Sequence, residues 1–295
     1  MSSSVQQDGT VKLTAGSFVW WDISSETDPG VLQSNLPPGV EFKPGFPSPK
    51  EALLAACRMV YRDSDQLKET QKGQPCLAIT KRTWVGDVPQ HDSQFTLCVT
   101  DNYTVYPKVG FPPGTDLGDI QAHVRRLQGR HQAVDISMEL VKLVTKELDG
   151  IVVRPSGGVY FVPEHNVGRL KQIADAVIVA GCGETKTSIV VADATYDDRT
   201  IDSLRDRAVA EFKGEASAML AEIIEGATSE RCLDNRGAKC ITLAEKVRRY
   251  ERTLQATLTD VWVVLDALAS VTKVTDAIKL SSDIGMGDEL SEAFA

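Results

Sequence analysis

Apolar residues follow two different spacings along the chain, and the change from one to the other falls near residue 195. Before it, short runs rich in β-branched and aromatic residues are typical of strands, in which alternate side chains face opposite sides. After it, apolar residues recur every three or four positions, as they do on one face of a helix. The strands are predicted at 11–22, 75–87, 93–107 and 185–193.

Capping and turn signals divide the first part further. Ser48 can cap the helix that follows it, because Glu51 stands three residues later. A second helical pattern runs from 116 to 148, with an interruption near Gly129. At 150–165, two β runs flank a Ser-Gly-Gly turn, which predicts a hairpin.

The helical pattern of 197–280 has a polar break at about 226–238. Two helices of about 30 residues would each be about 45 Å long and would fold back on one another. The sequence therefore predicts an α+β fold, in which a small mixed or antiparallel sheet with packed helices precedes a long antiparallel α-helical hairpin. The predicted segments are a flexible arm at 1–10, an α/β body at 11–194, the helical hairpin at 195–280 and a disordered acidic tail at 281–295.

The second helix of the predicted hairpin carries more apolar positions than one narrow stripe holds. Such a helix is usually buried on two sides, here against its own body or against another subunit. The pattern therefore predicts coiled-coil packing and a protein interface, either with a second copy of the chain or with another protein. The predicted interface residues are Leu243, Leu254, Leu258, Val261, Trp262 and Leu265.

Composition and charge limit the classes of function. The net charge of −9 argues against a strongly basic nucleic-acid-binding surface over the whole molecule. No apolar run approaches the roughly 20 residues that cross a bilayer, and residues 1–10 are polar, so we expect a cytoplasmic protein that does not enter a membrane. The six cysteines form no CxxC pair and the four histidines no ligand pattern, so we expect reduced thiols, no metal site and no cofactor.

Two segments come close to phosphate chemistry. AGCGETKT (180–187) has threonine where a phosphate-binding loop has glycine before lysine, and it follows a helix, so a glycine helix stop leading into a strand is the favoured interpretation. Asp193 and Asp197 follow a strand, where metal-dependent phosphotransfer sites are found, and with Arg154 they give one enzymatic hypothesis. The alternative is that Asp197 caps the long helix.

A local basic face is a second possibility. Such a face would bind nucleic-acid phosphates, with Trp84 or Tyr160 available for base stacking. Solvated helix faces and a structural hairpin explain the same residues. The basic residues concerned are Lys81, Arg82, Arg125, Arg126, Arg130 and Arg154.

Three motifs in this order resemble an uncharacterised family of plasmid- and phage-borne proteins of bacteria and archaea. They are PSPKEALLAACR (47–58), RPSGGVYFVP (154–163) and KVRRYERTL (246–254), and they follow an N-terminal strand with aromatic residues. The resemblance implies a mobile-element setting, with the cytoplasm of the host cell as its location. It implies no activity and no functional residue.

The leading hypothesis is a non-enzymatic accessory, scaffolding or assembly protein of a phage or plasmid, which binds itself or a partner protein through the C-terminal helices. A nucleic-acid-binding protein is the alternative. The absence of a G-x-S-x-G, H-E-x-x-H or G-x-G-x-x-G pattern in usable context favours a protein without catalytic activity.

Overall fold

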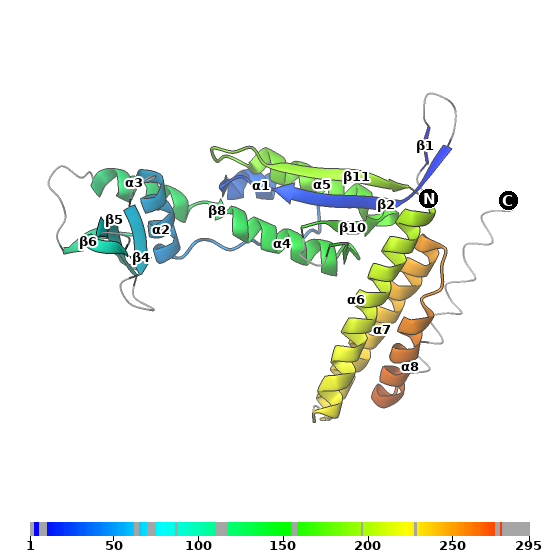
Figure 1. The fold of residues 1–295 in the computed structure, drawn as a ribbon. Coiled ribbons are helices and arrows are strands. Elements are labelled where there is room, and N and C mark those ends of the chain that lie inside the picture. Colours follow the sequence, from blue (N-terminus) through cyan, green and yellow to red (C-terminus); the bar gives the residue numbers. More distant parts are fainter. Residues whose placement is uncertain are drawn as a thin grey trace. The chain divides into compact units, whose positions relative to one another are not determined.

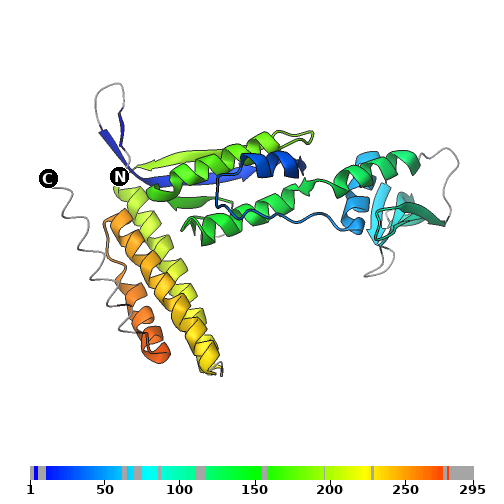
Figure 2. The same ribbon diagram turned by 180° about the vertical axis from the view of Figure 1, so that it is seen from behind.

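The chain adopts an α+β fold, as predicted, and it divides into two compact units (Figures 1 and 2). The computed structural model describes residues 3–5, 11–61, 65–69, 75–85, 88–109, 117–154, 158–195, 197–226, 229–274 and 278. Unit 1 consists of residues 1–21, 142–171 and 190–295, and unit 2 of residues 22–141 and 172–189.

The sheet of unit 1 is built around one long strand, β2, to which three other strands pair. β10 pairs antiparallel with β2 from Tyr160 opposite Val19 to Pro163 opposite Gly16, and with β9 on its other side. The predicted hairpin is thus confirmed as β9–β10, while its turn residues 155–157 lie outside the described residues. The strands are β1 (Ser3–Val5), β2 (Val11–Asp22), β9 (Ile151–Val152), β10 (Tyr160–Pro163) and β11 (Ser188–Thr195).

Three C-terminal helices form the larger core of unit 1. The predicted antiparallel hairpin is present as α6 (Asp198–Ile224) and α7 (Glu230–Leu254), and Asp197 caps α6 by accepting a hydrogen bond from the Thr200 amide. The second predicted helix is divided, because Gln255 takes a left-handed conformation that ends α7. The chain then turns back as α8 (Thr259–Thr272), which packs against both α6 and α7.

Two further helices contribute residues to both units. They are α4 (Ala133–Lys146) and α5 (Glu164–Ala180). The predicted helical pattern of 116–148 is confirmed as α3 (Leu117–Gln128) and α4, which are separated by a turn at Gly129 and the short strand β8. The predicted flexible arm contains strand β1, whereas the predicted acidic tail at 281–295 lies outside the described residues.

Unit 2 holds a second antiparallel sheet, β4–β5–β6–β7, with helices on one face. Helix α2 (Pro49–Val60) begins with the predicted capping box: the Glu51 amide donates to Ser48 Oγ, and the Ser48 amide donates to Glu51 Oε2. α2 and α3 pack on one another and bury Leu53 and Ile120 with the sheet residue Leu97. The strands are β4 (Asp65–Glu69), β5 (Cys76–Val85), β6 (Val88–Val99) and β7 (Val105–Val109).

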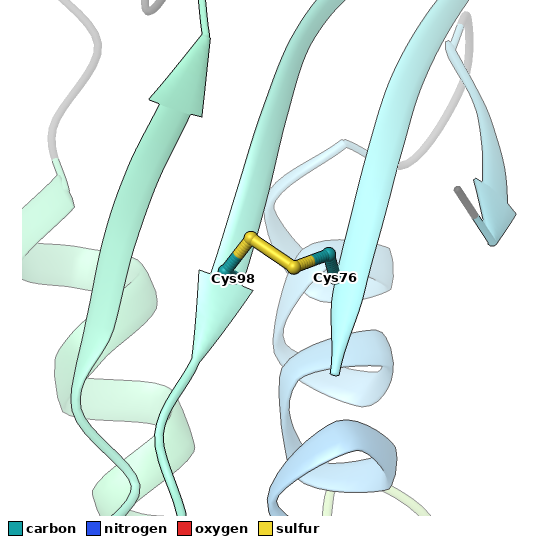
Figure 3. The surroundings of a disulfide bond; sticks show 2 residues. All are labelled: Cys76 and Cys98. Atoms are coloured by element: carbon teal, nitrogen blue, oxygen red, sulfur yellow. A yellow bond between two sulfur atoms is a disulfide. The ribbon is translucent and has the colours of Figure 1, made fainter. Parts of the chain in front are cut away.

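A disulfide joins Cys76 on β5 to Cys98 on β6 (Figure 3). The two residues lie directly opposite one another, and the Val99 amide donates to the Pro75 carbonyl beside them. This is a non-hydrogen-bonded pair, at which facing side chains of antiparallel strands come closest. The expectation of mostly free thiols does not hold for this pair, because strand register, and not sequence spacing, brings the two cysteines together.

The remaining part of unit 2 joins β3 (Glu26–Thr27) to β8 (His131–Gln132), and β3 leads into the short helix α1 (Pro29–Asn35). The AGCGETKT segment packs here. The Gly183 amide donates to Ser24 Oγ, and a Cβ atom on Gly183 would lie 2.3 Å from Ser25 Oγ. The glycine is therefore needed for close packing, in agreement with a helix stop that leads into strand β11.

Candidate functional site

The turn after α4 binds one face of α7 in unit 1. Asp149 adopts a left-handed conformation with φ of 55°, and its carbonyl oxygen accepts a hydrogen bond of 2.7 Å from the hydroxyl of Tyr250. Its carboxylate accepts two hydrogen bonds from Arg249, from Nε at 2.7 Å and from Nη2 at 3.1 Å. This forked pairing fixes both the position and the orientation of the turn.

Lys246, one helical turn before Tyr250 on α7, also binds the segment that follows α4. Its ammonium group donates to the carbonyls of Thr145 and Gly150 at 3.3 and 3.2 Å, and it lies 5.4 Å from the ring centre of Phe212. A cation is favourable at this place because the last carbonyls of a helix carry partial negative charge. Burial lowers the pKa of Lys246, an effect that Glu211 and other nearby carboxylates oppose. We call Asp149, Lys246, Arg249 and Tyr250 the turn cluster.

Electrostatics within the turn cluster keep Asp149 ionised. Burial alone would raise its pKa, but hydrogen bonds from His165 and Arg249, together with the charges of Arg249 and Lys246, lower that pKa to about 2. His165 Nε2 lies 3.5 Å from the carboxylate. Asp149 is therefore a fixed anion at physiological pH and a poor proton donor.

Glu211 of α6 lies close to the same cluster. One of its carboxylate oxygens accepts a hydrogen bond of 3.0 Å from the Val152 amide of β9. Burial raises the pKa of Glu211, whereas the hydrogen bond from Val152 and the charge of Lys246 lower it. The polar groups of the turn cluster and Glu211 are thus engaged with one another and with the backbone.

A cavity of about 590 Å³ opens beside the turn cluster, between α6 and α7. Its two long walls are these helices, and the end of α4 closes it on one side. Small and apolar side chains lie between the charged ones. We call it the α6–α7 groove, and its lining residues are Thr145, Lys146, Asp149, Glu215, Ala218, Met219, Glu222, Ala238, Lys239, Thr242, Leu243 and Lys246.

Residues 115–282, more than half of the chain, match a family of unknown function, DUF6744. The chain belongs to the DUF6744 family. The matched region contains α4 to α8, and so includes the whole turn cluster and every residue that lines the groove. No curated protein and no solved structure matches the chain.

Two charged groups that line this DUF6744 site are held within the chain. Asp149 pairs with Arg249, Lys246 donates to two backbone carbonyls, and the lining contains no cysteine, serine or histidine. Within the described parts of the chain, no three His, Cys, Asp or Glu side chains gather as a metal site. In those same parts, no helix is long and apolar enough to cross a membrane.

The residues predicted as a protein interface lie mainly in the interior of the DUF6744 protein. Because α8 turns back onto α6 and α7, the apolar residues of α7 and α8 pack with those of α6 in one core. The chain itself therefore covers them. The expectation of uncovered apolar surface is therefore corrected. Buried are Leu243, Leu254, Leu258, Val261 and Leu265, each at most 3% exposed, while Trp262 is half-buried and donates to Glu251.

The predicted basic residues do not form one described surface. In unit 2, Arg126 pairs with Glu26 at 2.9 Å and Arg130 pairs with Asp28, so both guanidinium groups already have carboxylate partners. Arg125 is exposed in the same unit, and Arg154 is exposed in unit 1. The side chains of Lys81, Arg82 and Trp84 lie outside the described residues, and Tyr160 is buried and stacks on Trp21.

The aspartates of the enzymatic hypothesis have structural partners. Asp197 is the N-cap of α6, and Asp193 accepts a long hydrogen bond of 3.4 Å from Ser17 on the neighbouring strand. The sequence reasoning missed the turn cluster itself. Its signal was present in KVRRYERTL, since Lys246, Arg249 and Tyr250 recur at the spacing that places them on one helical face.

Proposed function

We propose that this protein is a non-enzymatic accessory or assembly protein, which binds a polypeptide through its C-terminal helices. What supports the proposal is the α6–α7 groove, which lies on the side of the helix pair away from α8. On α7, the groove residues Thr242 and Lys246 lie on the opposite face of the helix from Cys240. The thiol of Cys240 contacts the Leu265 carbonyl of α8. The groove is therefore open where a further helix could pack.

The character of the groove favours a protein partner over a small anion or a nucleic acid. Glutamates line the α6 wall and lysines the α7 wall, and the exposed residues Ala218 and Ala238 line the groove beside them. Small side chains in the lining let a helix approach closely, and charges of both signs select its orientation. A phosphate-binding surface would need a clear excess of basic groups.

The test fills the groove with a bulky side chain. Ala238→Trp places an indole in the exposed lining of the groove, whereas Ala267→Trp places the same group on the exposed face of α8 as a matched control. Light scattering after size-exclusion chromatography and binding to proteins encoded beside this gene are then compared. We expect Ala238→Trp to lose self-association or partner binding and Ala267→Trp to keep it, with equal thermal unfolding.

Two outcomes would count against this proposal. A wild-type chain that stays monomeric and binds no neighbouring gene product would remove it. Salt-sensitive retention on DNA or RNA that survives Ala238→Trp would favour the nucleic-acid alternative instead.

The phage or plasmid setting and the cytoplasmic location are part of the same proposal. Disulfides are rare in reducing compartments, so a cytoplasmic location predicts that Cys76 and Cys98 are thiols in living cells. Rapid alkylation of acid-quenched cells, followed by mass spectrometry, measures their state. Quantitative disulfide in the cell would contradict the cytoplasmic location.

A further inference from the structure

Helices α6 and α7 lie side by side (Figures 1 and 2). Contacts at two levels along the pair fix the register of one helix against the other. Phe212 of α6 meets Tyr250 of α7, with ring centres 5.0 Å apart. Further along, Glu222 of α6 forms an ion pair with Arg236 of α7. Since the helices are antiparallel, each step forward along α6 corresponds to a step back along α7.

This register places opposite charges at matching heights on the two walls. Glu215 of α6 lies level with Lys246 of α7, and one heptad further on Glu222 lies level with Lys239. The α6 wall is thus acidic at two levels and the α7 wall is basic at the same two. Among the described residues, neither Glu215 nor Lys239 has an ion-pair partner within the chain.

Such a face is complementary to itself. Two copies can meet groove to groove about a twofold axis parallel to the helices, which lays α6 of one copy against α7 of the other at the same height. Glu222 of each copy then faces Lys239 of the second copy. The other face-to-face arrangement, with the axis across the helices, lays the acidic α6 walls against one another, and like charges disfavour it.

The size of the open face sets the strength to expect. About 20 Å of each helix is exposed beyond the turn cluster, and two helices are about 20 Å wide, which gives a footprint of about 400 Å² per copy. Interfaces of this size are weak and reversible.

We infer that the occupant of the α6–α7 groove is a second copy of this chain, in a twofold dimer that pairs α6 with α7 of the partner copy. The inference rests on the proposed assembly function and specifies its partner. It predicts a dimer that dissociates on dilution and weakens as salt rises, because its charge pairs lie at the edge of solvent.

Charge reversal at one level tests this arrangement. Glu222→Lys and Lys239→Glu should each place like charges across the dimer at two symmetric contacts, and raise the dimer Kd by about tenfold or more. The two single variants mixed together should restore association, because every contact in the mixed dimer then joins opposite charges. The double variant Glu222→Lys/Lys239→Glu should also restore it. Sedimentation equilibrium at low salt measures all four, and circular dichroism confirms that each variant is folded.

The possible failures are distinguishable. A wild-type chain that is monomeric at its highest soluble concentration overturns the second-copy inference, while loss of another protein partner in Ala238→Trp would leave the proposed function standing. A wild-type dimer that neither single reversal weakens overturns this interface but not self-assembly. A dimer that each single variant weakens, without recovery in the mixture, overturns the pairing of α6 with α7.

Discussion

Each of the two units buries an apolar core, but the contacts that stabilise unit 1 internally differ in kind from those that stabilise unit 2. In unit 1, the turn cluster joins the turn between α4 and β9 to α7, with Asp149 and Tyr250 bound across about 100 residues of sequence. Unit 2 has a covalent staple, Cys76–Cys98, across adjacent strands of its sheet. The stability that the turn cluster gives to unit 1 depends on each of its side chains. The stability that the disulfide gives to unit 2 depends on redox conditions. The two units should therefore respond to different perturbations.

The largest effect should come from Tyr250, which is completely buried and packs against Phe161 and Phe212. Tyr250→Ala should lower the free energy of unfolding of unit 1 by about 3–5 kcal/mol, the usual cost of removing a buried aromatic ring. Hydrogen exchange of amides in α6 and α7 measures this loss, and amides of β5 and β6 in unit 2 provide the comparison.

A conservative variant separates the ring from its hydroxyl. Tyr250→Phe keeps the packing and removes only the hydrogen bond to the Asp149 carbonyl, which should cost about 1 kcal/mol. Equal losses for Tyr250→Phe and Tyr250→Ala would mean that packing around this ring contributes little, in conflict with its position in the core.

Reduction of the disulfide should have the next largest effect, and in the other unit. Its cysteines are separated by 22 positions, and opening a loop of this size should destabilise unit 2 by about 3 kcal/mol. Cys76→Ser/Cys98→Ser, or wild type in dithiothreitol, should lose amide protection in β5 and β6 while α6 and α7 are unchanged. Equal protection in both redox states would show that the staple carries no stability.

Most elements of the fold could be predicted from local sequence signals, and the structure shows which elements could not. The capping box at Ser48, the cap at Asp197 and the hairpin at β9–β10 depend on residues close together in sequence, and all are present. The break between α7 and α8 was missed because no glycine or proline marks it; Gln255 takes the left-handed conformation instead.

The candidate site was less predictable, because its geometry depends on tertiary contacts. The apolar pattern of 243–268 was correctly identified, but the sequence could not show that α8 would cover it. Nor could spacing show that Arg126 meets Glu26, 100 positions away, or that Cys76 meets Cys98. Periodicity identifies which face of a helix is apolar, and only the fold decides what that face meets.

Acidification should distinguish the units further, through Asp149. Its pKa falls from 3.8 to about 2 in the folded protein, so its ion pairs stabilise unit 1 fully above about pH 4 and are lost as the pH falls toward 2. The carboxylate is 15% exposed, and the loss should be about 2 kcal/mol. Asp149→Asn, which cannot titrate, should remove this part of the pH dependence in urea unfolding followed at α7. A wild-type and variant difference that is constant from pH 5 to pH 2 would contradict the assignment.

The smallest effects should arise from the two arginine pairs of unit 2, and their order tests whether burial decides the strength of an ion pair. Glu26 is only 7% exposed, so Arg126→Ala leaves a buried carboxylate without its partner and should cost about 1 kcal/mol. Asp28 is 30% exposed and still accepts hydrogen bonds from the Gly30 and Val31 amides, so Arg130→Ala should cost less than Arg126→Ala, as expected for a surface pair. Urea unfolding followed by exchange in β3 and β8 measures both variants, with Arg125→Ala as the exposed control. If Arg130→Ala proves the more damaging, the bond between Arg130 and Asp28, and not the burial of Glu26, dominates this part of unit 2.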